Sequence, residues 1–138
     1  IDHGKNIEIL AIGDSVAIWQ EKNANIKSFI IDNHYKFYKK PTLLCNISNN
    51  DKFFFDEFNI SWSSIKIQKN SIYNGDIFLI TDALAERVFN LINQKKFSFA
   101  IEILKKDKKE FESWVLNERS CNLLKKDDTT VAWIKIND

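Results

Sequence analysis

The segment that decides the fold covers residues 75–92 and reads GDIFLITDALAERVFNLI. Its first part holds the continuous apolar run Ile77–Ile80, which is typical of a buried strand. From residue 83 onward the apolar side chains recur every three or four positions, and this spacing predicts an amphipathic helix over about 83–94. The chain therefore changes from strand periodicity to helix periodicity within this segment.

Strands are expected mainly before this segment and helices after it. The β-branched and alternating stretches predict strands at residues 7–12, 16–20, 26–31, 60–68, 77–80 and 130–136. Helices are expected at residues 83–94, 97–104 and about 111–119. Strands and helices that do not alternate regularly predict an α+β fold, and no repeat or boundary divides residues 1–138 into separate domains.

Turn signals connect several of these strands. The Gly13-Asp14 pair predicts a tight hairpin between the first two strands, which the third strand would extend into an antiparallel meander. The Asn74-Gly75 pair predicts a second turn before the central apolar strand. Residues 32–59 show no regular periodicity, and we expect a long, partly packed excursion there.

The composition limits the classes of function. The 138 residues are 44% hydrophobic, and 20 Lys and Arg against 19 Asp and Glu give a formal net charge of +1. This balance creates no global field toward nucleic acid or an anionic membrane, so neither is an expected partner. No apolar run approaches the roughly 20 residues that a membrane-spanning helix needs. The lysine-rich run at 105–109 is expected to be a solvated connection between helices.

The two cysteines, Cys45 and Cys121, lie far apart and have no histidine beside them. They predict neither a disulfide framework nor a structural zinc site, and they suit a reducing cytoplasm, which is the expected location. The chain starts at Ile1 and contains no Met. We therefore expect that a further segment precedes Ile1 in the natural protein.

Aspartates stand at three of the expected strand ends. Asp14 follows the first strand, Asp82 follows the central one, and Asp127 with its neighbour Asp128 precedes the last one. Carboxylates that converge at strand ends would form a site for a hard divalent cation, which prefers oxygen ligands. Each aspartate also has an ordinary structural explanation, in a turn or at a helix cap. The spacing alone leaves both explanations open.

The same stretches resemble motifs of the PP2C-type metal-dependent protein phosphatases. Residues 10–15, LAIGDS, resemble the Gly-Asp-Ser strand of that family, and residues 75–86 resemble its GD-x-FLL-x-(S/T)-D strand and helix start. Residues 127–131, DDTTV, resemble its terminal D-(N/D)-x-T-V motif. Features similar to a bacterial branch of the family are the Thr81-Asp82-Ala83 variant, residues 37–44, the stretch Phe111–Val115 and Arg119.

This resemblance implies a fold, a chemistry and a set of ligands. The fold would be an α/β/β/α sandwich of antiparallel sheets flanked by helices, with residues 1–138 as the C-terminal portion of one phosphatase domain. The chemistry would be hydrolysis of phosphoserine and phosphothreonine in protein substrates with two or more Mn²⁺ or Mg²⁺ ions. Asp82 and Asp127 match carboxylates of the paired-metal centre, and Asp14 matches a position associated with an additional metal. Asp128 stands where the family usually has Asn.

The N-terminal half of that family has no counterpart in these residues. It carries an early acidic ligand, a metal-bridging Asp-Gly motif and basic phosphate-binding residues, so we expect the missing N-terminal segment of the same domain to be a partner of this chain. A catalytically silent pseudophosphatase or binding domain remains an alternative. A GDS-type esterase with Ser15 as nucleophile is a further one, although it needs a histidine base and the only histidines are His3 and His34.

Overall fold

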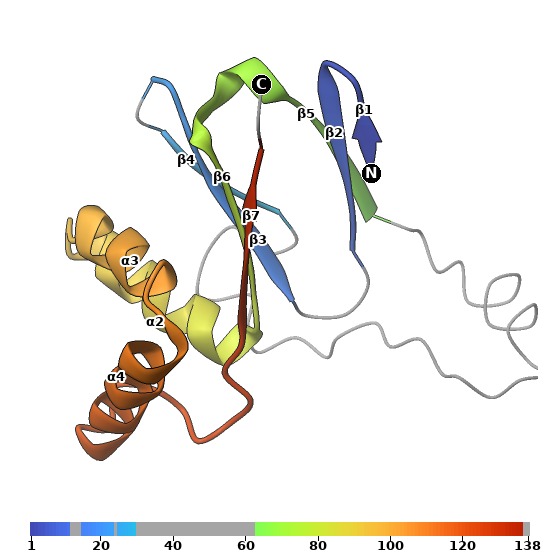
Figure 1. Ribbon diagram of the computed structural model, residues 1–138. Coiled ribbons are helices and arrows are strands. Elements are labelled where there is room, and N and C mark those ends of the chain that lie inside the picture. The colour runs from blue at the N-terminus through green and yellow to red at the C-terminus, as the bar shows by residue number, and fades with distance from the viewer. Residues whose placement is uncertain (12–14, 24, 30–62, 137–138) are drawn as a thin grey trace, which may run out of the picture.

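The computed structural model describes residues 1–11, 15–23, 25–29 and 63–136 (Figure 1). Within them, the strands are β1 (Asp2–His3), β2 (Asn6–Ala11), β3 (Val16–Glu21), β4 (Ile26–Phe29), β5 (Ser63–Gln68), β6 (Ile72–Ile80) and β7 (Val131–Lys135). The helices are α2 (Asp82–Asn93), α3 (Phe97–Leu104) and α4 (Lys108–Ser120), with a short 3₁₀ turn, η2, at Lys69–Ser71. The expected α+β class is confirmed. The excursion expected over residues 32–59 lies outside the described residues.

The strands form two antiparallel sheets, one ordered β1-β2-β5 and the other β4-β3-β6-β7. The expected hairpin between β3 and β4 is confirmed, because Ala17 lies opposite Phe29. The hairpin expected between β2 and β3 is wrong. β2 instead pairs with β5 along its whole length, with Ile7 opposite Ile67, and β3 lies in the other sheet. Hydrophobic spacing marks a strand but does not say which strand it pairs with.

The helices and the two sheets form three layers. Figure 1 shows the helices on one side of the four-stranded sheet and β1, β2 and β5 on its other side. Phe78 and Ile80 of β6 pack toward the helices, whereas Ile77 packs between the sheets. The apolar run of β6 is continuous because layers cover parts of both faces of this strand.

Each interface between layers has its own core. Between the helices and the four-stranded sheet the buried residues include Val16, Ile18, Phe78, Ile80, Leu84, Val88, Leu91, Ile103 and Leu104. Between the sheets they are Trp19, Ile67, Ile72 and Ile77, with Ile7, Ile9, Ile65 and Ile136 packed against them. Burying a side chain of this kind stabilises the fold by about 1.5–3 kcal/mol relative to exposure.

The Asn74-Gly75 pair does not end a strand, so the expected turn is wrong. Both residues have positive φ, 54° and 66°, and lie inside the continuous strand β6. The pairing shifts here, because Ile72 lies opposite Glu21 and Ile77 opposite Trp19. The Gly75 carbonyl accepts a hydrogen bond from the N–H of Ile136 (2.8 Å), just beyond the end of β7. The turn signal therefore produces an irregularity within the strand rather than a reversal.

The three helices match their expected positions closely. α2 and α3 lie within one residue of the predicted bounds, and α4 begins three residues earlier, where the Asp107 side chain accepts a hydrogen bond from the N–H of Glu110 (3.0 Å) and caps the helix. α2 and α4 are joined by an ion pair between Arg87 and Glu118, whose side chains are each 10% exposed. Among the described residues, none of the helices has the length and apolarity to cross a membrane.

Candidate functional site

At one end of the four-stranded sheet the start of β3, the end of β6 and the start of β7 lie side by side. Val16 of β3 lies opposite Ile80 of β6, and Ile80 lies opposite Val131 of β7. The chain therefore enters β3, leaves β6 and enters β7 at the same end of the sheet. Asp14 itself lies outside the described residues, and Ser15, the next residue, is exposed.

Two hydrogen bonds tie the end of β6 to the start of β7. The N–H of Thr81 donates to the carbonyl of Thr130 (3.2 Å), and the N–H of Thr130 donates to Oγ1 of Thr81 (3.2 Å). Asp82 follows Thr81 directly, and Asp127 lies three residues before Thr130. The tertiary structure thus brings the two segments that carry Asp82 and Asp127 to one edge of the sheet.

Asp82 is the first residue of α2, and Thr81 is its N-cap residue. The Oδ1 atom of Asp82 accepts a hydrogen bond from the N–H of Ala83 (2.7 Å), and the Thr81 side chain makes no capping bond in α2. A carboxylate in the first turn is also favoured by the helix dipole. Asp82 therefore lies in the first turn of α2 and not at the N-cap position that the ordinary explanation gave it, although its carboxylate does accept a backbone N–H there.

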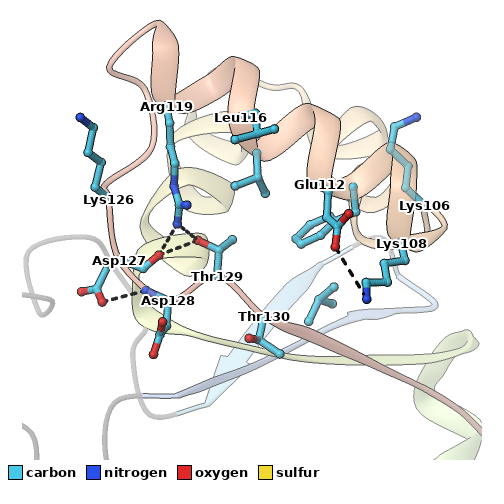
Figure 2. Close-up of a pocket in the computed structure, with 13 residues that line it drawn as sticks. Lys106, Lys108, Glu112, Leu116, Arg119, Lys126, Asp127, Asp128, Thr129 and Thr130 are labelled. Carbon is cyan, nitrogen blue, oxygen red and sulfur yellow. Dashed lines mark hydrogen bonds and ion pairs between the residues drawn. The ribbon is translucent and has the colours of Figure 1, made fainter.

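Arg119 of α4 holds the segment that carries Asp127 (Figure 2). Its guanidinium donates to the carbonyl oxygens of Lys125 and Asp127 and to Oγ1 of Thr129 (2.9 Å). The Thr129 hydroxyl donates in turn to the Asp127 carbonyl (3.1 Å). These bonds fix the backbone at Asp127 while its carboxylate points elsewhere and accepts the N–H of Asp128 (2.8 Å). In the sequence, only the resemblance pointed to Arg119. The structure shows that its guanidinium binds the segment that carries Asp127.

The aspartate carboxylates at this edge of the sheet have no oppositely charged side chain paired with them among the described residues. In the part of the chain that the structure describes, Asp82, Asp127 and Asp128 form no ion pair with lysine, arginine or histidine, whereas Asp76 and Glu118 do. Unpaired carboxylates fit a cation as partner. Among the described residues, however, no group of three or more Asp, Glu, His or Cys side chains is arranged to hold a metal ion. Further ligands would have to come from outside these residues.

A cleft of about 1250 Å³ runs beside α4 and ends at Asp127; we call it the α4 cleft (Figure 2). Its walls are α4 and the segment that leads into β7. The cleft is lined by Lys106, Lys108, Phe111, Glu112, Val115, Leu116, Arg119 and residues 126–131. Asp127 and Asp128 lie at one end of it and Lys106 and Lys108 at the other. Asp82 does not line it.

Sequence reasoning missed a cluster around Asp76, a buried residue of β6. Its carboxylate accepts hydrogen bonds from Lys105 Nζ (2.5 Å), Trp133 Nε1 (2.9 Å) and Lys135 Nζ (3.1 Å). Burial raises the pKa of Asp76, but the hydrogen bonds from these three side chains outweigh it and hold the pKa below its usual range. Lys105 was expected to be solvated and instead also lies 5.1 Å from the centre of the Trp133 ring.

The cluster joins β6, β7 and the end of α3. Asp76 lies opposite Lys135 in the sheet, toward the end away from Ile80 and Val131. The sequence did contain a signal for this cluster, because Asp76 directly precedes the apolar run Ile77–Ile80. A carboxylate in a buried strand requires hydrogen-bond partners. We assign the cluster to stability and not to the candidate site.

The residues of the esterase alternative are not brought together among the described residues. Ser15 precedes β3 in the four-stranded sheet, whereas His3 lies in β1 of the other sheet and pairs with Glu8 at 3.0 Å. His34 lies outside the described residues.

Comparisons of the whole chain with protein-family models, curated proteins and solved structures give no match.

Proposed function

We propose that this chain belongs to a metal-dependent serine/threonine protein phosphatase of the PP2C type. One observation carries the proposal. The motifs that resemble this family stand far apart in the sequence, yet the register of β3, β6 and β7 brings the ends of these strands to a common edge. A shared carboxylate site needs strand ends that meet in this way. The spacing of the motifs in the sequence did not by itself predict that these strand ends would meet.

Asp82 and Asp127 would hold the metal ions, with Asp14 near an additional one. Bound Mn²⁺ or Mg²⁺ would supply an activated water for direct attack on phosphorus and would offset the charge of the phosphoryl oxygens. The protein's own contribution is placement. The hydrogen bonds of Arg119 hold the backbone of Asp127, and the paired Thr81 and Thr130 hold the two strand ends together.

The same proposal assigns the layers of the fold. The helices and the two sheets would be three of the four layers of an α/β/β/α sandwich. A further segment of the same domain would supply the remaining helical layer, the missing acidic ligands and the basic groups that bind phosphate. The substrate would be a phosphoserine or phosphothreonine protein.

A second candidate is a PP2C-like pseudophosphatase or binding domain without turnover. It is favoured by the absence, among the described residues, of a group of three metal-ligating side chains. It is also favoured by the contacts of Asp82 and Asp127, each of which accepts a neighbouring backbone N–H as a structural aspartate would.

The deciding experiment measures Mn²⁺-dependent hydrolysis of a phosphothreonine peptide by the complete protein, together with calorimetric titration of Mn²⁺. Asp82→Asn and Asp127→Asn should each lower turnover about a hundredfold or more, because loss of a metal ligand removes transition-state stabilisation. Asp128→Asn is the matched control and should stay within about threefold of wild type, because the family usually has Asn at this position and asparagine keeps the backbone N–H that Asp127 accepts.

Unchanged turnover in both ligand variants would remove the site assignment. Absence of both a heat of Mn²⁺ binding and chelator-sensitive hydrolysis would favour the pseudophosphatase.

A further inference from the structure

The side chains that line the α4 cleft differ from one end of the cleft to the other. At one end lie the carboxylates of Asp127 and Asp128 with the cations Arg119 and Lys126, and at the other lie Lys106 and Lys108 with Glu112 (Figure 2). The apolar residues of the lining are Phe111, Val115, Leu116 and Val131, and Leu116 is 68% exposed. An apolar lining of this kind suits a docked apolar side chain.

The apolar part of the cleft is continuous with the core. Val115 is buried, and Phe111 and Val131 are partly buried against the core between the helices and the sheet. A side chain placed beside Leu116 would therefore rest on an ordered apolar floor. A site of this kind binds an apolar side chain more readily than a flat polar surface does.

Of the two lysines at the far end, Lys108 is available to a partner. The side chain of Lys108 is 89% exposed and its Nζ lies 3.9 Å from Glu112, and Lys106 Nζ lies 3.5 Å from Glu110. Exposed pairs one helical turn apart contribute only about 0.3–0.5 kcal/mol, so Lys108 can exchange its pair with Glu112 for an anionic group, whereas the Lys106 side chain is only 26% exposed. Two lysines, Lys106 and Lys108, stand against Glu112 at this end, so the end keeps a positive excess that complements an acidic side chain.

We propose that the α4 cleft binds the polypeptide that flanks the phosphorylated residue of a protein substrate. An apolar side chain of the substrate would lie against Phe111, Val115 and Leu116, and an acidic side chain would lie beside Lys106 and Lys108. The proposal rests on the proposed phosphatase function, because that function puts the phosphorylated residue at the Asp127 end.

The length of the cleft sets the spacing of these features in the substrate. Lys108 and Arg119 stand at opposite ends of α4, and at 1.5 Å per residue they are separated by about 16 Å along the helix. An extended peptide advances about 3.3 Å per residue. The acidic residue should therefore lie about five residues from the phosphorylated one, with the apolar residue about midway.

The test compares phosphothreonine peptides that carry Glu or Gln five residues before or five residues after the phosphothreonine, with leucine midway. The complete protein with Mn²⁺ is assayed by kcat/KM, and p-nitrophenyl phosphate serves as a small substrate that reaches only the metal end. Wild type should prefer Glu over Gln by about fivefold in one of the two directions, as an electrostatic contact of this kind allows. Lys108→Glu should remove this preference, whereas Lys109→Glu, on the same turn but outside the cleft, should keep it.

A second pair of variants tests the apolar part. Leu116→Ser should lower kcat/KM for all leucine-containing peptides about tenfold, and it should change hydrolysis of p-nitrophenyl phosphate less than about twofold. Leu123→Ser is the control, because Leu123 is also an exposed leucine, at 51%, but does not line the cleft. Unchanged thermal melting of the variants would establish that they fold.

The same peptides with a non-hydrolysable phosphonate in place of the phosphate give a readout without turnover, the Kd from fluorescence anisotropy. If the wild-type protein hydrolyses none of the substrates, the phosphatase proposal fails. The Kd values then decide by themselves whether the α4 cleft binds these peptides. Equal affinity for Glu and Gln peptides in both directions would overturn the inference, as would a Leu116→Ser variant that binds like wild type. A Glu preference that Lys108→Glu abolishes would support it.

Discussion

Replacing Asp76 with asparagine should cost about 2 kcal/mol of unfolding free energy at neutral pH and almost nothing at strongly acidic pH. The carboxylate is only 8% exposed and accepts hydrogen bonds from Lys105, Trp133 and Lys135. Asparagine keeps an oxygen acceptor but loses the charge. A hydrogen bond to a charged group contributes about 1.5–3 kcal/mol. Lys105 and Lys135 are 30% and 50% exposed, so water can solvate their ammonium groups when the carboxylate is lost, and this keeps the cost near the lower part of that range.

The sign of the pH dependence follows from the direction of the pKa shift. Burial raises the pKa of Asp76, and the hydrogen bonds from Lys105, Trp133 and Lys135 lower it further than burial raises it, so the pKa in the folded state lies below the unfolded value. The stabilisation is therefore fully present above the ordinary carboxyl pKa of about 3.9. It is lost as the pH falls through the folded-state pKa.

The assay is urea unfolding of wild type and Asp76→Asn, followed by tryptophan fluorescence at pH values from 7 down to 2.5. The difference in unfolding free energy between the two proteins should be largest at neutral pH and should shrink below about pH 4. Asp2→Asn is the control, because Asp2 pairs with Lys69 at the surface and should barely change the midpoint. A deficit of Asp76→Asn that is equally large at pH 7 and pH 2.5 would refute the reasoning.

Three more substitutions test other contacts. Glu118→Gln leaves the buried Arg87 guanidinium without its counter-charge and should lower stability by about 3 kcal/mol, measured as a drop in Tm of roughly 10 °C. Gly75→Ala should cost about 2 kcal/mol in urea unfolding, because φ is +66° and an added Cβ would lie 2.4 Å from the carbonyl oxygen of Ile136. Arg119→Ala releases the backbone that carries a proposed metal ligand and should weaken Mn²⁺ binding about tenfold in calorimetry.

Two of these have a matched control. Glu110→Gln changes a glutamate of the same helix that is 59% exposed, and a loss as large as that of Glu118→Gln would argue against the buried pair. Gly4→Ala has a similar φ, +69°, but no atom within 4 Å of the added Cβ, so it isolates backbone strain from the clash. Equal costs at the two glycines would contradict the clash. Unchanged Mn²⁺ affinity in Arg119→Ala would show that the arginine only stabilises the fold.

Local patterns in the sequence determined the elements of this protein. The apolar spacing from residue 83 predicted α2, and the same reasoning placed α3 at its observed bounds. These patterns succeed because the period of apolar side chains depends on the local backbone repeat and on which face is buried. The three aspartates at strand ends were visible for the same reason, since strand boundaries are local features.

Only the tertiary structure decided what these elements meet. It paired β2 with β5 instead of β3, kept β6 continuous through Gly75, and gave the buried Asp76 its partner Lys105. It also brought the strand ends beside Asp82 and Asp127 to one edge of a sheet. Strand pairing and buried charge pairs depend on contacts between distant residues, and many pairings satisfy the same hydrophobic pattern, so the packing of the whole chain selects among them.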